Sequence, residues 1–545
     1  MTFYLCNGPY LKPAVLQSDV PAMKEASEKL KQVFEDNGLL STGEPLLNIL
    51  NSVVNWAHSN KNFLPPSSTG GIHEHSWEPN DLLSIFMSWG ITPATLPVLQ
   101  ESLRSVSEKL AEILREAQGD NQEESEVPVG DTSASFLSTV ERLLTATTFA
   151  LQSGKDPEKK EELPYLDAFR LNLSHNTFTG IVSLSLSCFD AEPCIAEISH
   201  AARSMIILSG TLAPLEKSDD EFGVPFEQKL SASHVVDGRR QIYAGVVSDL
   251  SPVTRQAKLT FQTLSNTRML IDIGNFLVTV ARCTPGGIIV FAPSFFALRT
   301  LSSQWKSQDI FGIINTRCNK GTYIDDYDPL ESNSRQEYMQ GLIEGFKNDC
   351  AEDSDRDGAV LFTVCRGQMS EGINLKDSYC RSVIILGVPF PALKDWKVVS
   401  KKKYQERKLR RSTGNIRSGE DWYLAKALRA TSQAAGRAIR HKDDWGSIFF
   451  VDSRYNQKRF YEMIPRWMQD HVRRDLSMTT VAHQLSAFSH ERLGHEYVPR
   501  EPPTTASSGS ESDDSPNEKR SRAPSAGDKD PNSTNNKRQS VMEIF

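Results

Sequence analysis

The chain has 545 residues, of which 39% are hydrophobic and 24% are charged, and its formal net charge is −8. This composition is ordinary for a soluble globular protein with roughly two to four domains. It excludes a chain that is basic overall, so nucleic-acid binding would require a local basic face. No run of about 18 apolar residues predicts a membrane span, and residues 1–10 lack the pattern of a secretory signal.

Residues 1–165 are predicted to be mainly helical. Asp19 and Pro21 begin a helical pattern that Gly38 ends, as these residue types do at the two ends of a helix. A second helix is predicted over Pro97–Gln118. A third helix carries apolar residues on one face: Phe136, Val140, Leu143, Leu144 and Leu151.

From about residue 166 to residue 492, short apolar runs alternate with helical stretches. This alternation predicts an α/β fold in which helices cover both faces of a parallel sheet. The predicted strands are Ser204–Leu208, Gly287–Ala292, Ala359–Val364, Ser382–Val388 and Ser447–Val451. The predicted helices among them are Phe295–Lys306, Ser334–Asn348 and Asp421–Ile439.

The end of the chain, residues 493–545, becomes rich in Pro, Ser, Asp, Lys and Asn after Val498. Such a segment buries too little apolar surface to offset the entropy lost on ordering. We therefore predict a disordered tail.

The eight cysteines are scattered singly along the sequence, and none forms a Cys-x-x-Cys pair. This spacing is typical of reduced thiols in an intracellular protein. We therefore predict no metal site.

Two loops that follow predicted strands carry small and polar residues. Ser209, Gly210 and Thr211 follow Ser204–Leu208 at the strand end where α/β folds place ligand residues. The second loop, after Ala359–Val364, has glycines that let backbone amides approach a ligand. Its polar candidates are Ser370, Glu371 and Asn374, beside Gly372. A plain turn explains either loop when it is considered alone.

A predicted helix near residue 433 carries two arginines and a glutamine. Gln433, Arg437 and Arg440 are spaced i, i+4 and i+7, so on one helix they would share a narrow sector. Guanidinium groups stay charged and bind phosphate oxygens in a fork, which suits the charge on a transferred phosphoryl group. The alternative is a solvated arginine face on an amphipathic helix.

The stretch between residues 397 and 417 is strongly basic and is interleaved with aromatic residues. A basic groove with aromatic platforms binds single strands without sequence preference. A solvated charged helix is the alternative. The candidate contacts are Lys401, Lys402, Lys403, Tyr404 and Arg407.

Four segments resemble, in chain order, motifs III, IV, V and VI of superfamily 2 helicases. They are the loop that begins at Ser209, the segment Ile288–Phe295, the loop after Ala359–Val364 and the segment that carries Gln433. The resemblance is strongest to the xeroderma pigmentosum group D branch, and within it to the Fanconi anaemia group J type. In that branch motif III reads Ser-Gly-Thr-Leu, motif V Ser-Glu-Gly-x-Asp and motif VI Gln-x-x-Gly-Arg-x-Ile-Arg-His. Trp89–Thr95 also looks like a segment of the group J Arch region. Asn374 stands where the family has aspartate, which puts in doubt any contact that requires a carboxylate.

The resemblance implies a nucleotide role for the arginine segment. Arg440 looks like the arginine finger that reaches the γ-phosphate. Arg437 looks like its companion, and Gln433 would bond to the nucleotide side of the cleft.

For the two loops, the resemblance implies coupling roles. Glu371, Gly372 and Asn374 look like motif V residues that link the nucleotide to bound DNA, which Ser370 would contact. The other loop looks like the element that couples ATP hydrolysis to movement along the strand. Its residues are Ser209, Gly210 and Thr211.

The resemblance also implies four regions. They are a helical Arch-like region over 1–165, a remnant of the first RecA-like domain over 166–215 that ends in motif III, a second RecA-like domain over 216–492 that carries motifs IV to VI, and the tail over 493–545.

Three features of the family are missing from this sequence. It has no Gly-x-x-x-x-Gly-Lys-Ser/Thr, no Asp-Glu-Ala-His box and none of the four clustered cysteines. ATP and Mg²⁺ would thus need a first RecA-like domain, and we predict that this chain lacks the 4Fe–4S cluster. Alone, the chain is predicted to bind nucleotide weakly and not to hydrolyse it. An incomplete gene model, an isoform and a decayed paralogue stay open.

By resemblance, the predicted function is that of an ATP-dependent 5′-to-3′ DNA helicase in nuclear DNA repair, of which this chain carries the C-terminal motor half. The expected partners are single-stranded or forked DNA and repair proteins, without a membrane. The alternative is a catalytically inactive DNA-binding or scaffold fragment. Telomere-regulating and cohesion-linked relatives of the same branch are a third reading, but Trp89–Thr95 favours group J.

Overall fold

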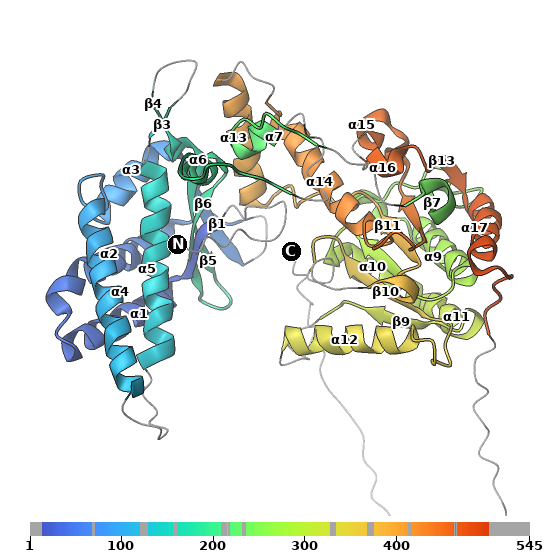
Figure 1. Ribbon diagram of the computed structural model, residues 1–545, viewed down its shortest axis with the longest axis horizontal. Helices are drawn as coiled ribbons and strands as arrows, with labels where there is room; N and C mark the ends of the chain where they lie inside the picture. The colour runs from blue at the N-terminus through green and yellow to red at the C-terminus, as the bar shows by residue number, and fades with distance from the viewer. Residues whose placement is uncertain are drawn as a thin grey trace, which may run out of the picture.

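The computed structural model arranges the chain in two lobes, with α13 (Trp396–Arg411) and α7 (Ser218–Phe222) between them (Figure 1). The structure describes residues 14–67, 71–119, 129–151, 153–155, 162–208, 215, 218–230, 236–327, 334–367, 375–411, 416–462, 464 and 466–500. The predicted tail after Val498 lies almost wholly outside these residues. None of the helices in the described ranges is long and apolar enough to cross a membrane.

The amino-terminal lobe packs helices against a four-stranded antiparallel sheet of order β1-β6-β5-β2. The strands are β1 (Ala14–Asp19), β2 (Ile72–Trp77), β5 (Phe169–Asn176) and β6 (Val182–Cys188). The helices are α1 (Val20–Asp36), α2 (Leu40–Asn60), α3 (Pro79–Ser88), α4 (Leu96–Gly119), α5 (Val129–Leu151) and, after β6, α6 (Glu192–Ala201).

The three predicted helices of this lobe are confirmed as α1, α4 and α5. Gly38 adopts a φ of +66°, the left-handed conformation that ends α1. The helices α2 and α3 were not predicted. Gly43 and Pro45 interrupt the helical signal of α2 in the sequence, because Pro45 lies inside the helix and has no N–H to donate to the carbonyl four residues earlier.

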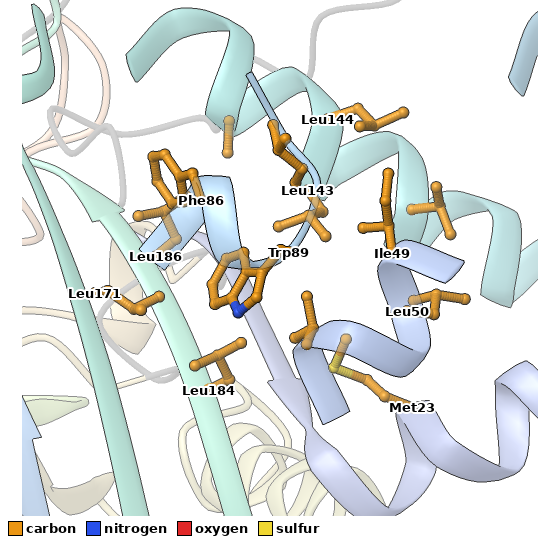
Figure 2. Packing of buried hydrophobic residues seen from close by; sticks show 14 of the residues in the cluster. Met23, Ile49, Leu50, Phe86, Trp89, Leu143, Leu144, Leu171, Leu184 and Leu186 are labelled. Carbon is orange, nitrogen blue, oxygen red and sulfur yellow. The ribbon is translucent and has the colours of Figure 1, made fainter. Parts of the chain in front are cut away.

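One hydrophobic core joins these helices to the sheet. Figure 2 shows Trp89 beside Leu184 and Leu171 of the sheet, with Leu143 of α5 close by. The core runs from Val20 to residue 189 and takes in Tyr404 of α13, so the predicted boundary at residue 165 does not separate two cores in the described residues. The assignment of these parts to an Arch region and a RecA-like remnant stays a prediction.

The carboxy-terminal lobe is built on a seven-stranded sheet of order β13-β7-β12-β11-β8-β10-β9, and all its pairings are parallel. The predicted α/β class is therefore confirmed. The strands are β7 (Ile242–Asp249), β8 (Ile288–Ala292), β9 (Gly321–Ile324), β10 (Ala359–Val364), β11 (Ser382–Leu386), β12 (Gly446–Val451) and β13 (Val472–Ser477).

Helices cover both faces of this sheet, because its central strands are apolar on both sides. The first face is covered by α9 (Thr267–Cys283), α10 (Phe295–Ser307), α11 (Ile310–Arg317) and α17 (Met478–Leu493). The second is covered by α12 (Arg335–Asp349) and α14 (Gly419–Ala435).

One predicted strand is wrong. Residues 204–208 form no strand in the structure, and Ile206 and Leu208 are 81% and 87% exposed. The apolar run has strand propensity, but no other strand of the described chain pairs with it. Conversely, three strands were not predicted. The edge strand β9 is short, the edge strand β13 is largely polar, and a glycine interrupts the apolar run of β7.

Candidate nucleotide and nucleic-acid site

The arginine segment departs from its predicted helical geometry. Helix α14 ends at Ala435, so only Gln433 is helical, and Arg437 and Arg440 follow in a turn. The expectation that all three lie along one helical edge is therefore wrong. Gly436 caps the helix with a φ of −64° and a ψ of −3°, and a glycine favours helix continuation poorly.

The loop that carries Arg440 is fixed by Asp444, whose side chain is 1% exposed. Asp444 Oδ2 accepts the backbone N–H of Arg440 at 2.9 Å. Its Oδ1 accepts from Arg381 Nη1 at 2.7 Å and from the Trp445 N–H at 2.9 Å. The Arg381 guanidinium also lies 4.5 Å from the Trp445 ring centroid. This carboxylate therefore holds the arginine loop against the start of β12.

The two arginines still share one loop, between the end of α14 and the start of β12. Burial raises the pKa of the Cys380 thiol to about 12, and the positive charges of Arg440, Arg381 and Arg437 act on the same thiol in the opposite direction. The loop that holds both arginines lies at the edge of the sheet where the strands β11 and β12 begin, because Asp444 binds both the Arg440 backbone and Arg381. An anion at this edge would meet a concentrated positive charge.

His441 ties the arginine loop to the segment that leads into β11. Its Nε2 lies 2.8 Å from Asp377 Oδ1. Asp377 adopts a positive φ of 57°, which is uncommon for a residue other than glycine. Asp377, His441 and Asp444 are close enough to share a metal ion, but Asp444 already accepts three hydrogen bonds. The group is therefore better suited to positioning the loop.

Two predicted segments lie outside the described residues. They are the motif III residues Ser209, Gly210 and Thr211, and the motif V residues Ser370, Glu371, Gly372 and Asn374. Of the flanking residues, Val364 ends β10 at the carboxyl edge of the sheet, and Leu375 lies in the core at 3% exposure. Motif IV is described: it forms β8, and Ser294 Oγ then caps α10 by accepting from the Ala297 N–H.

The basic stretch forms α13 (Trp396–Arg411), but it is not the free groove expected from the sequence. Lys401 Nζ donates to the Phe189 carbonyl, and Tyr404 donates its hydroxyl proton to Asp190. Lys408 Nζ lies 2.8 Å from the same carboxylate. Burial raises the pKa of Asp190, but the charges of Lys408 and Lys401 outweigh burial, and the net pKa is below the usual value.

The other predicted DNA contacts of α13 keep more exposure. Lys402 pairs with Glu420, and Lys403 is 61% exposed and 3.9 Å from Glu78. Arg407 is 29% exposed and lies 3.3 Å from Glu78. The helix thus turns Lys401 and Tyr404 into the amino-terminal lobe, and these two are unsuited to direct DNA contact in this arrangement.

Sequence reasoning missed the acidic partners of the basic segment. Helix α7 (Ser218–Phe222) places Glu221 between α13 and α14, where Arg429 donates two hydrogen bonds to its carboxylate. Arg417 Nη1 lies 3.3 Å from the same carboxylate. Burial raises the pKa of Glu221, but the hydrogen bonds and charge of Arg429 lower it to a net value of about 2. The adjacent run Asp219-Asp220-Glu221, opposite in charge to the basic stretch, was the available signal.

Replacing Asp444 with asparagine is expected to lower the free energy of unfolding of the carboxy-terminal lobe by about 3 kcal/mol, because Arg381 would keep a buried charge without its counter-ion. Denaturant unfolding followed by intrinsic fluorescence measures the loss. The neighbouring exposed Asp443→Asn is the matched control and is expected to stay within about 0.5 kcal/mol of the parent. Equal stability of the two variants would contradict the assigned role.

Residues 277–471 match a family model described as "Helicase C-terminal domain". The "Fanconi anemia group J protein homolog" of Gallus gallus is 26% identical over 492 residues, which cover 86% of this chain and 38% of that relative. The "Regulator of telomere elongation helicase 1 homolog" of Drosophila persimilis is 34% identical over 275 residues, 50% of this chain and 26% of the relative. The chain thus spans less than half the length of these relatives. The resemblance to group J-like helicases is confirmed.

Among solved structures, "XPD_Helicase" superposes with a TM-score of 0.43 at 14% identity. The superposition covers 85% of this chain and 65% of the solved chain. "XPD_APO" gives the same TM-score and identity, and covers 73% of that chain.

Proposed function

On the premise that residues 277–471 form the C-terminal domain of a helicase related to the group J type, we propose that this chain is the C-terminal motor part of an ATP-dependent DNA helicase. We further propose 5′-to-3′ movement, a role in nuclear DNA repair, and single-stranded or forked DNA as the partner. The observation that carries the proposal is that Arg437 and Arg440 share one loop, between α14 and β12, whose backbone Asp444 fixes at Arg440.

In this proposal the arginine loop stabilises phosphate charge presented by another lobe. Arg440 would face the γ-phosphate, and Arg437 would add a second guanidinium beside it. Because Asp444 holds the Arg440 backbone before any ligand arrives, little reorganisation is needed at the moment of reaction. Gln433, in the last turn of α14, would orient the nucleotide.

ATP and Mg²⁺ fit this chain only in part. The arginine loop suits a triphosphate, but the sequence has no phosphate-cradling lysine loop and no Asp-Glu-Ala-His carboxylates for the metal. Mg²⁺ would neutralise the phosphate oxygens when bound. We propose that its ligands come from outside this chain.

The described cysteines do not suit an iron–sulphur cluster. Burial raises the pKa of Cys318 to about 11 and that of Cys350, Cys365 and Cys380 to about 12, whereas cluster ligands are thiolates. No cysteine of the described ranges belongs to a group that could share a metal ion. We therefore propose that the cluster of the family has no site among these residues.

A second candidate function is that of an inactive DNA-binding or scaffold fragment. The absence of a phosphate-binding loop from the sequence favours it. A helicase part and a DNA-binding fragment both require DNA binding by this chain, and they differ in whether the arginine loop takes part in hydrolysis.

The purified chain is expected to bind single-stranded DNA with an affinity that falls as salt rises. If roughly three phosphates are neutralised, a plot of log affinity against log salt has a slope near −2. Fluorescence anisotropy with a labelled oligothymidine from about 50 to 200 mM salt measures the slope. Absent binding at the lowest salt, or a slope of zero, would contradict both candidates.

The same preparation is expected to hydrolyse ATP no faster than its Arg440→Ala variant. Turnover well above that variant would show that the chain is a complete motor, against the proposal that it carries only one part.

A further inference from the structure

We propose that Arg407 and Arg411 of α13 form a phosphodiester-binding site at the junction of the two lobes, and that the Asp167 carboxylate occupies this site until a nucleic-acid strand displaces it. The inference rests on the proposed function, because it assumes that this chain binds nucleic acid. Beyond that function, we assign Asp167 as an internal anion that competes with the strand, and a row of cations on α13 as the site where the strand binds.

The contacts cross from one lobe to the other. Asp167 lies in the turn Tyr165–Ala168 that precedes β5. Its Oδ2 is 2.8 Å from Arg411 Nη1, and its Oδ1 is 3.4 Å from Arg407 Nε. Arg407 Nη1 lies 3.3 Å from Glu78 Oε2. Two carboxylates of the amino-terminal lobe therefore stand where phosphate oxygens would stand.

The arginines retain donor capacity in this arrangement. Arg407 Nη2 is buried and has no hydrogen-bond partner among the described residues, and its Nε makes no hydrogen bond although Asp167 Oδ1 lies 3.4 Å away. The same holds for Nε and Nη2 of Arg170, which is 1% exposed and whose Nε lies 3.1 Å from Glu78. A buried N–H without an acceptor is costly, and an unfilled ion position is one explanation of such a group.

Charge favours an added anion at this place. Four cations, Lys403, Arg407, Arg411 and Arg170, face the two carboxylates Glu78 and Asp167. The cations outnumber the carboxylates, so exchanging a single carboxylate for a phosphate leaves the local charge favourable. Asp167 is 26% exposed on its side chain, so water reaches it and a competing anion can too.

The spacing of the cations points to a strand. Lys403, Arg407 and Arg411 recur every four residues along α13, which places them about 6 Å apart on one face of the helix. A row of this kind can follow successive phosphates of an extended single strand. Guanidinium adds a fork that matches phosphate oxygens. A single free phosphate would contact only one of these three cations at a time.

The test compares two variants with the same change in net charge. Asp167→Asn is expected to raise the affinity for a labelled oligothymidine roughly three- to fivefold above the affinity of Glu101→Gln. Glu101 forms a comparable exposed pair with Arg104 at 2.9 Å, on α4 of the amino-terminal lobe. Equal affinities of the two variants would overturn the inference while leaving DNA binding itself intact. No binding by any variant would instead count against the proposed function.

A second pair of variants tests the cations. Arg411→Gln is expected to lower affinity severalfold and to abolish the gain from Asp167→Asn in the double variant, whereas Arg410→Gln on the adjacent face keeps that gain. Additive effects of Asp167→Asn and Arg411→Gln would overturn the inference. Thermal unfolding of each variant checks that the fold is kept. Inorganic phosphate at equal phosphate concentration is expected to bind far more weakly than the strand, and equal binding would overturn the assignment to a strand.

Discussion

Replacing Glu221 with glutamine is expected to lower the free energy of unfolding at pH 7 by about 3 kcal/mol, because a pKa that falls from 4.5 to about 2 on folding corresponds to roughly that stabilisation. The glutamine would leave Arg429, which is 8% exposed, with a buried charge and no anion. Urea unfolding of the parent and Glu221→Gln at a series of pH values measures the difference.

The pH dependence of this difference has a defined sign. The pKa of Glu221 is lowered in the folded state, so its stabilisation is complete above the unfolded value of 4.5 and is lost as pH falls toward about 2. The parent and the variant should therefore differ fully at pH 7 and approach each other as pH falls below about 4. A difference that is the same at pH 7 and pH 3 would show that the charge of Glu221 is not the cause.

Glu420→Gln is the matched control for this variant. Glu420 also pairs with a cation of the junction, Lys402, but its side chain is 65% exposed. An exposed pair contributes little, so we expect a loss below about 1 kcal/mol. The contrast matters for function because Glu221 connects the segment after motif III to α14, the helix that leads into the arginine loop.

Replacing Trp89 with alanine is expected to lower the stability of the amino-terminal lobe by about 3–5 kcal/mol, the cost of removing a large buried aromatic side chain. Trp89 is 1% exposed, and its ring centroid lies 5.5 Å from that of Trp56 and 5.6 Å from that of Phe86 (Figure 2 shows its surroundings). Hydrogen exchange should report faster opening of α2 and α3, with the seven-stranded sheet much less affected.

Trp89→Phe is the informative comparison. Trp89 Nε1 is buried without a hydrogen-bond partner among the described residues, so phenylalanine loses volume but also removes an unsatisfied donor. We expect less than half of the loss seen with alanine. Trp305 of the other lobe differs, because its Nε1 donates to the Leu270 carbonyl at 2.8 Å, and Trp305→Phe should cost proportionally more. Equal losses for both phenylalanine variants would contradict this explanation.

The segment Trp89–Thr95, which resembles the group J type, also has a structural role in the amino-terminal lobe. The sequence associated this segment with the family, and the structure places Trp89 and Ile91 in the core. Thr95 Oγ1 donates to the Gly90 carbonyl and accepts the Thr92 N–H, which fixes the turn before α4. These residues thus pack the core and fix a turn, which the resemblance alone did not show.

The sequence by itself determined the elements whose signals are local. The apolar runs of β8, β10, β11 and β12 predicted buried parallel strands, because a strand covered on both faces has to be apolar on both. The order of the motif-like segments also pointed to a resemblance to group J-like helicases before any fold was known. The end of α14 was misjudged, since the i, i+4, i+7 spacing continues past Gly436 while the backbone does not.

Only the tertiary structure decided which charges are available. The basic run of α13 is continuous in the sequence, yet Lys401 donates to the Phe189 carbonyl, whereas Lys403 is 61% exposed and lies 3.9 Å from Glu78. Ion pairs between Asp167 and Arg411, or Glu221 and Arg429, join residues more than 200 positions apart. Spacing along a chain constrains the neighbours within one helix or strand, whereas the partner of a charge depends on how separate elements pack.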